Sequence, residues 1–359
     1  MKFGPLKLYL IDICPLAKFI KHEGIKNGEI LALASFPNFD PNTVNNHSQS
    51  KTANQRFNRV IQGSYELGSV MKIFTLAMAL EEERINLSDE FDVWKCINKN
   101  RKKCLSDYRK SKVQYLNAAQ CLINSSNICM AQIAQKVGRE KQKSFLQKIG
   151  LLDEYLLEIH ETGSPILPER WTDNSMITIS FGQGLSVVPL SFASSVATIV
   201  NGGYKIQPTL NFYNTETKKG TKIISKETSE NLIYAMRQVV KNGSGKKADI
   251  PGYAVIGKTG TADIPCNGNY TGCGNRTSFV GAFPGWDPKY VILISYEKPK
   301  SNLEEGIQGD SSFHNAGPTA GKIISLIAPI LNIEYDNNRK IKKPRIDSVQ
   351  NKIVKEKAL

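Results

Sequence analysis

The alternation of hydrophobic and polar positions along the chain predicts a mixture of helices and strands. Residues 70–80 are apolar almost all round, with only Lys72 and Thr75 as exceptions, which is typical of a buried helix. Further helices are expected over the segments 115–123, 128–137, 190–200, 228–240 and 319–331. Runs rich in β-branched and aromatic residues predict strands at 30–34, 254–261, 277–283 and 290–296.

These elements favour the α/β (α+β) class. We expect an antiparallel sheet covered by helices, with a helical lobe placed beside a cleft. The last three predicted strands follow one another and suit consecutive antiparallel pairing. At 359 residues the chain is long enough for a large core, arranged as two lobes, and no internal repeat is visible.

A serine and a lysine three residues apart stand at the start of the most hydrophobic helix, as Ser69 and Lys72. Residues at this spacing share a helix face, so the amine can reach the hydroxyl. A serine becomes a good nucleophile when a base takes its proton, and lysine can be that base if burial and nearby cations lower its pKa. The alternative is a serine cap followed by a surface lysine, and the apolar surroundings of Lys72 argue against it.

A second polar motif, Ser125-Ser126-Asn127, falls between two predicted helices, where Asn124 and the two serines are natural caps. If it lies beside Ser69, the Ser125 hydroxyl can relay a proton to a leaving amine, and the Asn127 amide can bind a substrate carbonyl. As pure structure the segment is simply the start of a helix. The motif alone leaves both interpretations open.

A third motif, Lys258-Thr259-Gly260-Thr261, ends a predicted strand. Gly260 has no side chain, which permits close approach of a ligand, and Lys258 adds a cation near the nucleophile. An extended peptide can pair along such a strand edge. Thr259 and Thr261 offer hydroxyls to a terminal carboxylate, and the amides of Thr261 and Ser69 suit an oxyanion hole. The alternative for this motif alone is a solvent-facing lysine in a tight turn.

The three motifs in this order resemble the S-x-x-K, S-x-N and K-T-G set of serine β-lactamases and penicillin-binding proteins. Over residues 27–331 the chain is most similar to class B penicillin-binding proteins of the septal, FtsI-like type. The segments that support this resemblance beyond the motifs are 28–35, 58–59, 65–68, 181–184, 201–203 and 277–281.

The resemblance implies a serine D,D-transpeptidase that cross-links the stem peptides of peptidoglycan through an acyl-enzyme. The peptidoglycan strands would derive from lipid-linked precursors, and no metal or cofactor would be needed. It implies β-lactams as inhibitors, a division glycosyltransferase and other divisome proteins as partners, and the periplasmic face of the inner membrane as the location. It assigns catalytic roles to Ser69, Lys72, Ser125, Asn127 and Lys258, and substrate binding to Thr259, Gly260 and Thr261.

The resemblance also divides the chain into a divergent segment at 1–26, a transpeptidase domain at 27–335 and a basic disordered tail at 336–359. In the family a hydrophobic strand precedes the domain, but residues 18–25 are interrupted by charged side chains, so we expect residues 8–13 to substitute for it.

The family's membrane helix and its pedestal domain would lie upstream of this sequence. No stretch of the chain is long and apolar enough to span a bilayer, and charged residues interrupt any signal peptide. We therefore expect a fragment, produced by an altered reading frame or a misplaced start.

The chain is basic, with 47 Lys and Arg against 33 Asp and Glu and a net charge of +14. Such a balance favours anionic partners. Nucleic acid is the obvious class, but the sequence has no zinc-finger spacing, RNP-like pattern or helix-turn-helix signal, so we expect no nucleic acid. Attraction to anionic lipid or cell wall, or a merely solvated surface, explains the charge more simply.

The chain has seven cysteines, an odd number. Cys96 with Cys104 and Cys266 with Cys273 form loop-like pairs that suit disulfides in an oxidising compartment, and unpaired thiols are the alternative. The absence of any C-x-x-C spacing and the scattered histidines argue against zinc.

Two alternatives to a transpeptidase stay open at this point. A class A β-lactamase needs a carboxylate for the deacylating water, and Glu169 is the only tempting candidate, in a loop that lacks the expected asparagine. The other alternative is a truncated, inactive remnant that preserves a penicillin site.

Overall fold

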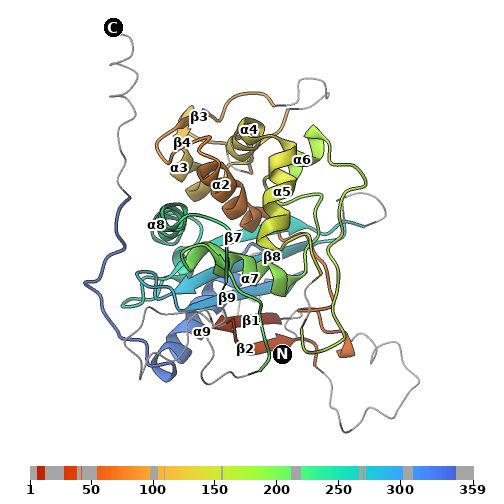
Figure 1. Cartoon of the computed structure of the whole chain (residues 1–359), viewed down its shortest axis with the longest axis vertical. Helices are drawn as coiled ribbons and strands as arrows, with labels where there is room; N and C mark the ends of the chain where they lie inside the picture. The colour runs from red at the N-terminus through yellow and green to blue at the C-terminus, as the bar shows by residue number, and fades with distance from the viewer. Residues whose placement is uncertain are drawn as a thin grey trace.

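In this computed structural model, the described residues are 6–12, 28–38, 42, 55–97, 104–108, 110–154, 157–211, 220–266, 270, 272–301 and 310–344. Their centre is a five-stranded sheet with the strand order β2-β1-β9-β8-β7 (Figure 1). Every pairing in it is antiparallel. The strands are β1 (Leu6–Asp12), β2 (Ile30–Ser35), β7 (Ile256–Asp263), β8 (Asn275–Phe283) and β9 (Tyr290–Glu297).

Strand β1 occupies the position between β2 and β9, where Leu8 pairs with Ala34 on one side and Ile294 on the other. The prediction that this N-terminal stretch supplies a strand is therefore confirmed. The charged segment 18–25 lies outside the described residues. At the opposite edge of the sheet, β7 pairs only with β8 among the described strands.

Alternate residues of the central strands face two different cores, as the two-residue period of a strand requires. Val291 and Leu293 of β9 belong to the larger core, whereas Ile292 and Ile294 pack in a second cluster with α9 (Ala316–Ile330). Helix α7 (Pro189–Val200) contacts the sheet from the side of the larger core and crosses in front of it in Figure 1. Helices thus cover both faces of the sheet.

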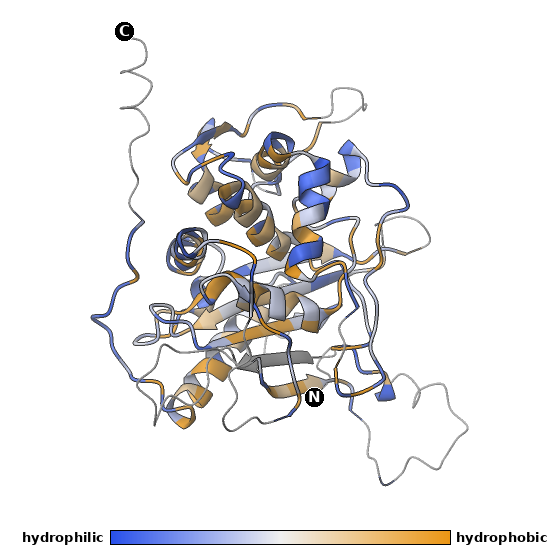
Figure 2. Cartoon of the chain, in the orientation of Figure 1, coloured by the Kyte–Doolittle hydropathy of each residue, from blue (hydrophilic) through white to orange (hydrophobic). Residues whose placement is uncertain are grey.

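The helical lobe stands above β7 in Figure 1 and is built around α2 (Lys72–Glu81). Nine of its ten residues are buried, and its Phe74 ring packs edge-on against Phe192 of α7 at 5.2 Å. Figure 2 shows the hydrophobic residues gathered on α2, the sheet and α9, and hydrophilic residues on α5 and α8. The remaining helical elements are η2 (Gly68–Met71), α3 (Ala118–Ile123), α4 (Asn127–Val137), α5 (Arg139–Ile149), α6 (Asp173–Ile179), α8 (Lys226–Asn242), η3 (Lys246–Ala248) and α9 (Ala316–Ile330).

Two predicted segments begin differently from the sequence predictions, and two helices were missed. The segment 115–123 begins as the short strand β4 (Tyr115–Asn117), paired with β3 (Glu90–Asp92), because Asn117 caps α3 through a capping box with Gln120. Strand β7 begins at Ile256 and not at residue 254, since Ala254 has a left-handed φ of 44° that ends regular pairing. Helices α5 and α6 were not predicted. A further pair of short strands, β5 (Tyr204–Lys205) and β6 (Thr221–Lys222), completes the described elements.

Residues 336–344 of the expected tail lie against the domain, where the Arg339 guanidinium stands 5.6 Å from the Trp286 ring centroid and Asp336 donates its backbone N–H to the Gly252 carbonyl. Residues 345–359 lie outside the described residues, so a disordered tail stays a prediction. Among the helices of the described ranges, none combines the length and the hydropathy that a bilayer crossing requires.

Candidate active site

The nucleophile candidate Ser69 lies in the short helix η2, immediately before α2. The turn that presents it is tightly enclosed by backbone: Gly68 has a φ of 66°, and a Cβ on Gly182 would stand only 1.9 Å from the Gly68 carbonyl oxygen. Glycine is needed at both places, at the first for its left-handed conformation and at the second for space. Ser69 itself is half-buried, so its hydroxyl is held at the surface of the core.

The amine of Lys72 is the centre of the site. It donates to Ser69 Oγ at 3.0 Å, to Ser125 Oγ at 3.1 Å and to the Ser125 carbonyl at 2.5 Å. It also donates to Asn127 Oδ1 at 2.7 Å. Lys72 is 0 % exposed. The structure therefore brings the first two predicted motifs together on a single buried amine.

Burial lowers the pKa of Lys72 well below its ordinary value, because an ammonium ion is poorly solvated inside the protein. The nearby charge of Lys258 lowers this pKa further, whereas the carboxylate of Asp107 raises it. A lowered pKa makes the neutral, proton-accepting form of the amine accessible, as a base for Ser69 requires.

Lys258, from the third motif, reaches the same serine from the sheet. Its amine donates to Ser125 Oγ at 3.0 Å and to the Thr259 carbonyl at 2.8 Å. Burial lowers its pKa from 10.5 to about 7. The sequence-based interpretation of Lys258 as a simple cation is thus incomplete, because its charge changes close to neutral pH.

Gly260 has a steric role in addition to the predicted one. A Cβ at this position would meet the Leu67 carbonyl oxygen at 2.5 Å and the Val70 nitrogen at 3.1 Å. Gly260 therefore allows β7 to pack directly against the serine-bearing turn. The predicted close approach of a ligand at Gly260 stays a prediction.

The other predicted residues lie nearby with different surroundings. The Thr259 hydroxyl is buried and shares a hydrogen bond with the Ser244 hydroxyl, whereas Thr261 is exposed. The side-chain amide of Asn127 is engaged at both ends, since Nδ2 donates to the Ser106 carbonyl at 3.3 Å and Oδ1 accepts from Lys72. In this structure Asn127 thus supports the lysine, and the predicted contact with a substrate carbonyl stays a prediction.

Sequence reasoning assigned no role to two carboxylates close to the site. Asp107 Oδ1 accepts from the backbone N–H groups of Asn127 and Ile128, at 2.5 and 3.1 Å. Glu66, two residues before Gly68, accepts from the Gly184 amide and the Tyr270 hydroxyl, each at 2.9 Å. Both contacts join segments far apart in the chain. Only the position of Glu66 beside the first motif was a signal in the sequence.

Three disulfides connect the cysteines of the described residues. The expected pairs Cys96–Cys104 and Cys266–Cys273 are both present. A third bond, Cys121–Cys129, was not expected and joins α3 to α4 on either side of the second motif. Both of its cysteines are 0 % exposed. The disulfide Cys121–Cys129 thus closes a loop that contains the Ser125–Asn127 turn.

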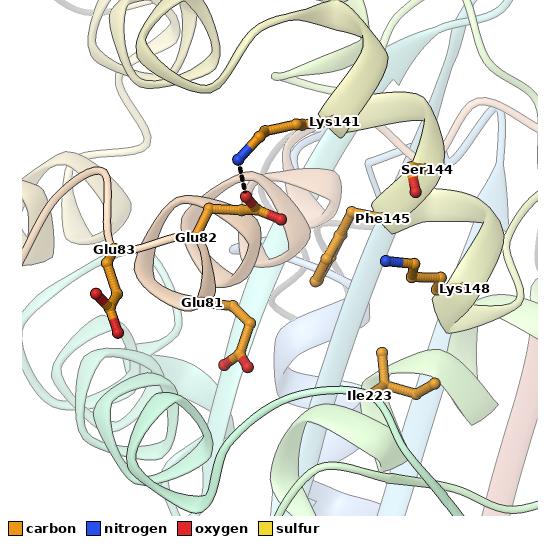
Figure 3. Close-up of a pocket in the computed structure, with 8 residues that line it drawn as sticks. All are labelled: Glu81, Glu82, Glu83, Lys141, Ser144, Phe145, Lys148 and Ile223. Atoms are coloured by element: carbon orange, nitrogen blue, oxygen red, sulfur yellow. Dashed lines mark hydrogen bonds and ion pairs between the residues drawn. The ribbon is translucent and has the colours of Figure 1, made fainter.

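A pocket of about 560 Å³ opens at the end of α2 opposite Lys72. Its lining is mostly charged, and Glu82 forms an ion pair with Lys141 across it (Figure 3). No residue of the three motifs lines this pocket.

Glu169, the candidate for a β-lactamase water, is exposed. Within the described part of the chain, no group of three or more His, Cys, Asp or Glu residues is arranged to hold a metal ion.

Comparison with known proteins agrees with this geometry. A family model described as the penicillin binding protein transpeptidase domain matches residues 24–325. The chain is 31% identical over 320 residues to a probable peptidoglycan D,D-transpeptidase FtsI of Caulobacter vibrioides, covering 86% of this chain and 53% of the relative. It is 33% identical over 334 residues to stage V sporulation protein D of Bacillus subtilis, covering 89% and 50%. The chain thus spans about half the length of these curated relatives.

Solved structures show the same fold. The transpeptidase domain of penicillin-binding protein 3 from Burkholderia pseudomallei superposes with a TM-score of 0.77 at 23% identity, covering 94% of this chain and 91% of that one. A peptidoglycan glycosyltransferase from Burkholderia ambifaria gives 0.75 at 22% identity, covering 93% and 92%. The mixed fold with an antiparallel sheet and a helical lobe is therefore the penicillin-binding fold, as the sequence predicted.

Proposed function

Because this chain belongs to the penicillin-binding protein transpeptidase family, we propose that it is the catalytic domain of a serine D,D-transpeptidase that cross-links peptidoglycan stem peptides. One observation supports this proposal most strongly. The single amine of Lys72 hydrogen-bonds both the Ser69 and the Ser125 hydroxyls, at 3.0 and 3.1 Å, inside a buried site.

In the proposed first half-reaction, neutral Lys72 takes the proton of Ser69 Oγ, and the oxygen attacks the carbonyl carbon of the penultimate D-Ala. The tetrahedral intermediate then collapses. The C–N bond to the terminal D-Ala breaks, and the leaving nitrogen receives a proton from Ser125, which is replenished from Lys72. The products are an ester on Ser69 and free D-Ala.

In the second half-reaction, an amine from a neighbouring strand attacks the ester carbonyl. Its proton passes through Ser125 to Lys72, and the C–O bond breaks with return of a proton to Ser69 Oγ. Backbone amides of Ser69 and Thr261 would stabilise the oxyanion in both steps, as the packing of β7 against η2 permits. The edge of β7 that faces away from β8, adjoining Thr259 and Thr261, would bind the extended donor peptide.

We assign a cell-division role and a location at the periplasmic face of the inner membrane to this domain as part of the same proposal. Peptidoglycan is built in an oxidising compartment of the envelope, and the three disulfides suit such a compartment. β-Lactams would acylate Ser69 as substrate analogues. A division glycosyltransferase and other divisome proteins stay the proposed partners, on the family resemblance of the sequence alone.

The test uses a donor that mimics the stem peptide, ending in D-Ala-D-Ala, together with a D-amino acid as acceptor. The purified chain is expected to release D-Ala and to form the exchanged peptide, and Ser69→Ala is expected to abolish both products while the fold is retained. Release of D-Ala with hydrolysis alone, at every acceptor concentration, would point instead to a carboxypeptidase. A folded chain that gives neither product would contradict the proposal.

A further inference from the structure

A segment remote from the three motifs reaches the start of α4 through Asp107. Its Oδ1 accepts from the backbone N–H groups of Asn127, at 2.5 Å, and Ile128, at 3.1 Å. The first N–H groups of an α-helix have no partner within the helix, so a carboxylate here satisfies donors that would otherwise be unpaired. A negative charge at a helix N-terminus is also favoured by the helix dipole.

The same segment orients the side chain of Asn127. The Ser106 carbonyl accepts from Asn127 Nδ2 at 3.3 Å, which directs Oδ1 toward the amine of Lys72, 2.7 Å away. The backbone and the side chain of this asparagine are therefore both held by two consecutive residues, Ser106 and Asp107. An altered position of this segment would change an acceptor of the catalytic amine directly.

The segment is itself anchored close to Asp107. The disulfide Cys96–Cys104 ends three residues before it, and the Leu105 amide donates to the Ile97 carbonyl at 3.5 Å. These contacts fix the chain just before Ser106. Asp107 is thus a fixed acceptor, half-buried in the described structure.

Asp107 also acts on Lys72 by charge. The amine of Lys72 is surrounded by the uncharged Ser69, Ser125 and Asn127, and the charged groups that influence it are Lys258 on β7 and Asp107. Lys258 disfavours the ammonium form of Lys72, whereas Asp107 favours it. Asp107 therefore acts on the site in two separable ways: it accepts hydrogen bonds from the start of α4, and its charge favours the ammonium form of Lys72.

We propose that Asp107 is a positioning residue for acyl transfer: it fixes the start of α4 so that Ser125 and Asn127 face the amine of Lys72. It does not touch the reacting atoms. The inference rests on the proposed function, because it assumes that Ser69 is acylated with Lys72 as the base.

The test measures the rate of Ser69 acylation by a fluorescent penicillin as a function of pH in the full chain. Asp107→Asn keeps an acceptor for the two N–H groups but removes the charge. We expect most of the maximal rate to remain and the acid limb to move to lower pH, since the pKa of Lys72 falls when the carboxylate is lost. Asp107→Ala removes the acceptor as well, and we expect its maximal rate to fall by roughly one to two orders of magnitude.

Asp92→Asn is the matched control, because Asp92 also accepts from a backbone amide, that of Trp94 at 2.9 Å, but does not contact the site. This control should leave the pH profile unchanged. A wild-type maximal rate for Asp107→Ala, a wild-type pH profile for Asp107→Asn, or equal shifts for the two asparagine variants would overturn the inference. If Asp107→Ala does not fold, the profile of Asp107→Asn decides alone. Failure of the wild-type chain to acylate would instead reject the proposed function.

Discussion

The amines of Lys72 and Lys258 meet at one hydroxyl, that of Ser125, at 3.1 and 3.0 Å. Both lysines are 0 % exposed, and burial lowers the pKa of each. Two buried amines cannot both be charged at little cost when they share a single acceptor. The lowered pKa of each lysine favours the neutral amine, which is the form that can remove a proton from Ser69.

Replacement of Lys258 should change the pH dependence of acylation. Its charge lowers the pKa of Lys72, so Lys258→Met should raise that pKa and move the acid limb of Ser69 acylation to higher pH. The rate of penicillin acylation, measured across pH, checks this. If the acid limb of the Lys258→Met profile stays in place or moves to lower pH, the two amines do not interact.

The same substitution should stabilise the fold. The pKa of Lys258 is lowered from 10.5 to about 7 on folding, so the folded state resists protonation. Burial of this amine lowers the free energy of unfolding. The loss is present in full below the pKa that Lys258 has in the folded state, and it disappears as the pH rises toward the pKa of the unfolded state. It amounts to roughly 5 kcal/mol at most, at 1.4 kcal/mol per pKa unit.

Lys258→Met should therefore unfold at a higher temperature than the wild type below about pH 7, with a smaller difference at alkaline pH. Thermal unfolding followed by circular dichroism measures this. Lys241→Met, at an exposed position on α8, is the control and should show no such pH dependence. Equal effects of the two substitutions would mean that Lys258 is not destabilised by burial.

Gly260→Ala should separate the strand from the nucleophile. The new Cβ would stand 2.5 Å from the Leu67 carbonyl oxygen, so β7 must move away from the turn that holds Ser69. We expect acylation to slow by roughly two orders of magnitude, since displacement by about 1 Å disrupts a catalytic geometry. Stopped-flow acylation measures the rate.

Gly138→Ala provides the comparison for Gly260→Ala. A Cβ there meets nothing within 4 Å, but its φ of 91° strains any other residue. It should lower stability by roughly 1 kcal/mol and leave the acylation rate unchanged. If both variants acylate at the wild-type rate, the contact between β7 and the serine turn is not needed for reactivity.

The buried disulfide Cys121–Cys129 should support both stability and reactivity. It closes a loop with a sequence separation of 8 that contains the second motif. Its removal in Cys121→Ala/Cys129→Ala should cost roughly 2 to 4 kcal/mol of unfolding free energy and slow acylation, because Ser125 and Asn127 gain freedom. Urea unfolding and acylation rates check the two effects.

Cys266→Ser/Cys273→Ser is the companion to that double variant, because its disulfide lies in the connection between β7 and β8 and leaves α3 and α4 untouched. It should lower stability without affecting how Ser125 meets Lys72. Identical losses of acylation rate in the two double variants would contradict a specific role for Cys121–Cys129.

Much of the site follows from short-range sequence patterns. Ser69 and Lys72 are one helical turn apart, and the apolar run after them predicts burial of the lysine. The substitute strand β1 and the covered antiparallel sheet follow from hydrophobic content and from the family resemblance.

What the sequence could not predict depends on contacts between distant segments. Asp107 acts on a helix that begins 20 residues later, and no local pattern marks it. The bond Cys121–Cys129 requires that two helices meet at their ends. The steric role of Gly260 appears only when β7 lies against Leu67. In each case the residue type is compatible with several local structures, and the tertiary contact selects one.

The most direct test of the central claim is to incubate the purified chain with a fluorescent penicillin and locate the adduct by mass spectrometry. We predict one long-lived adduct, on Ser69, that Ser69→Ala abolishes and Lys72→Met strongly reduces. Rapid turnover of the adduct would indicate a β-lactamase. An adduct on another residue, or a folded chain with no adduct, would contradict the account.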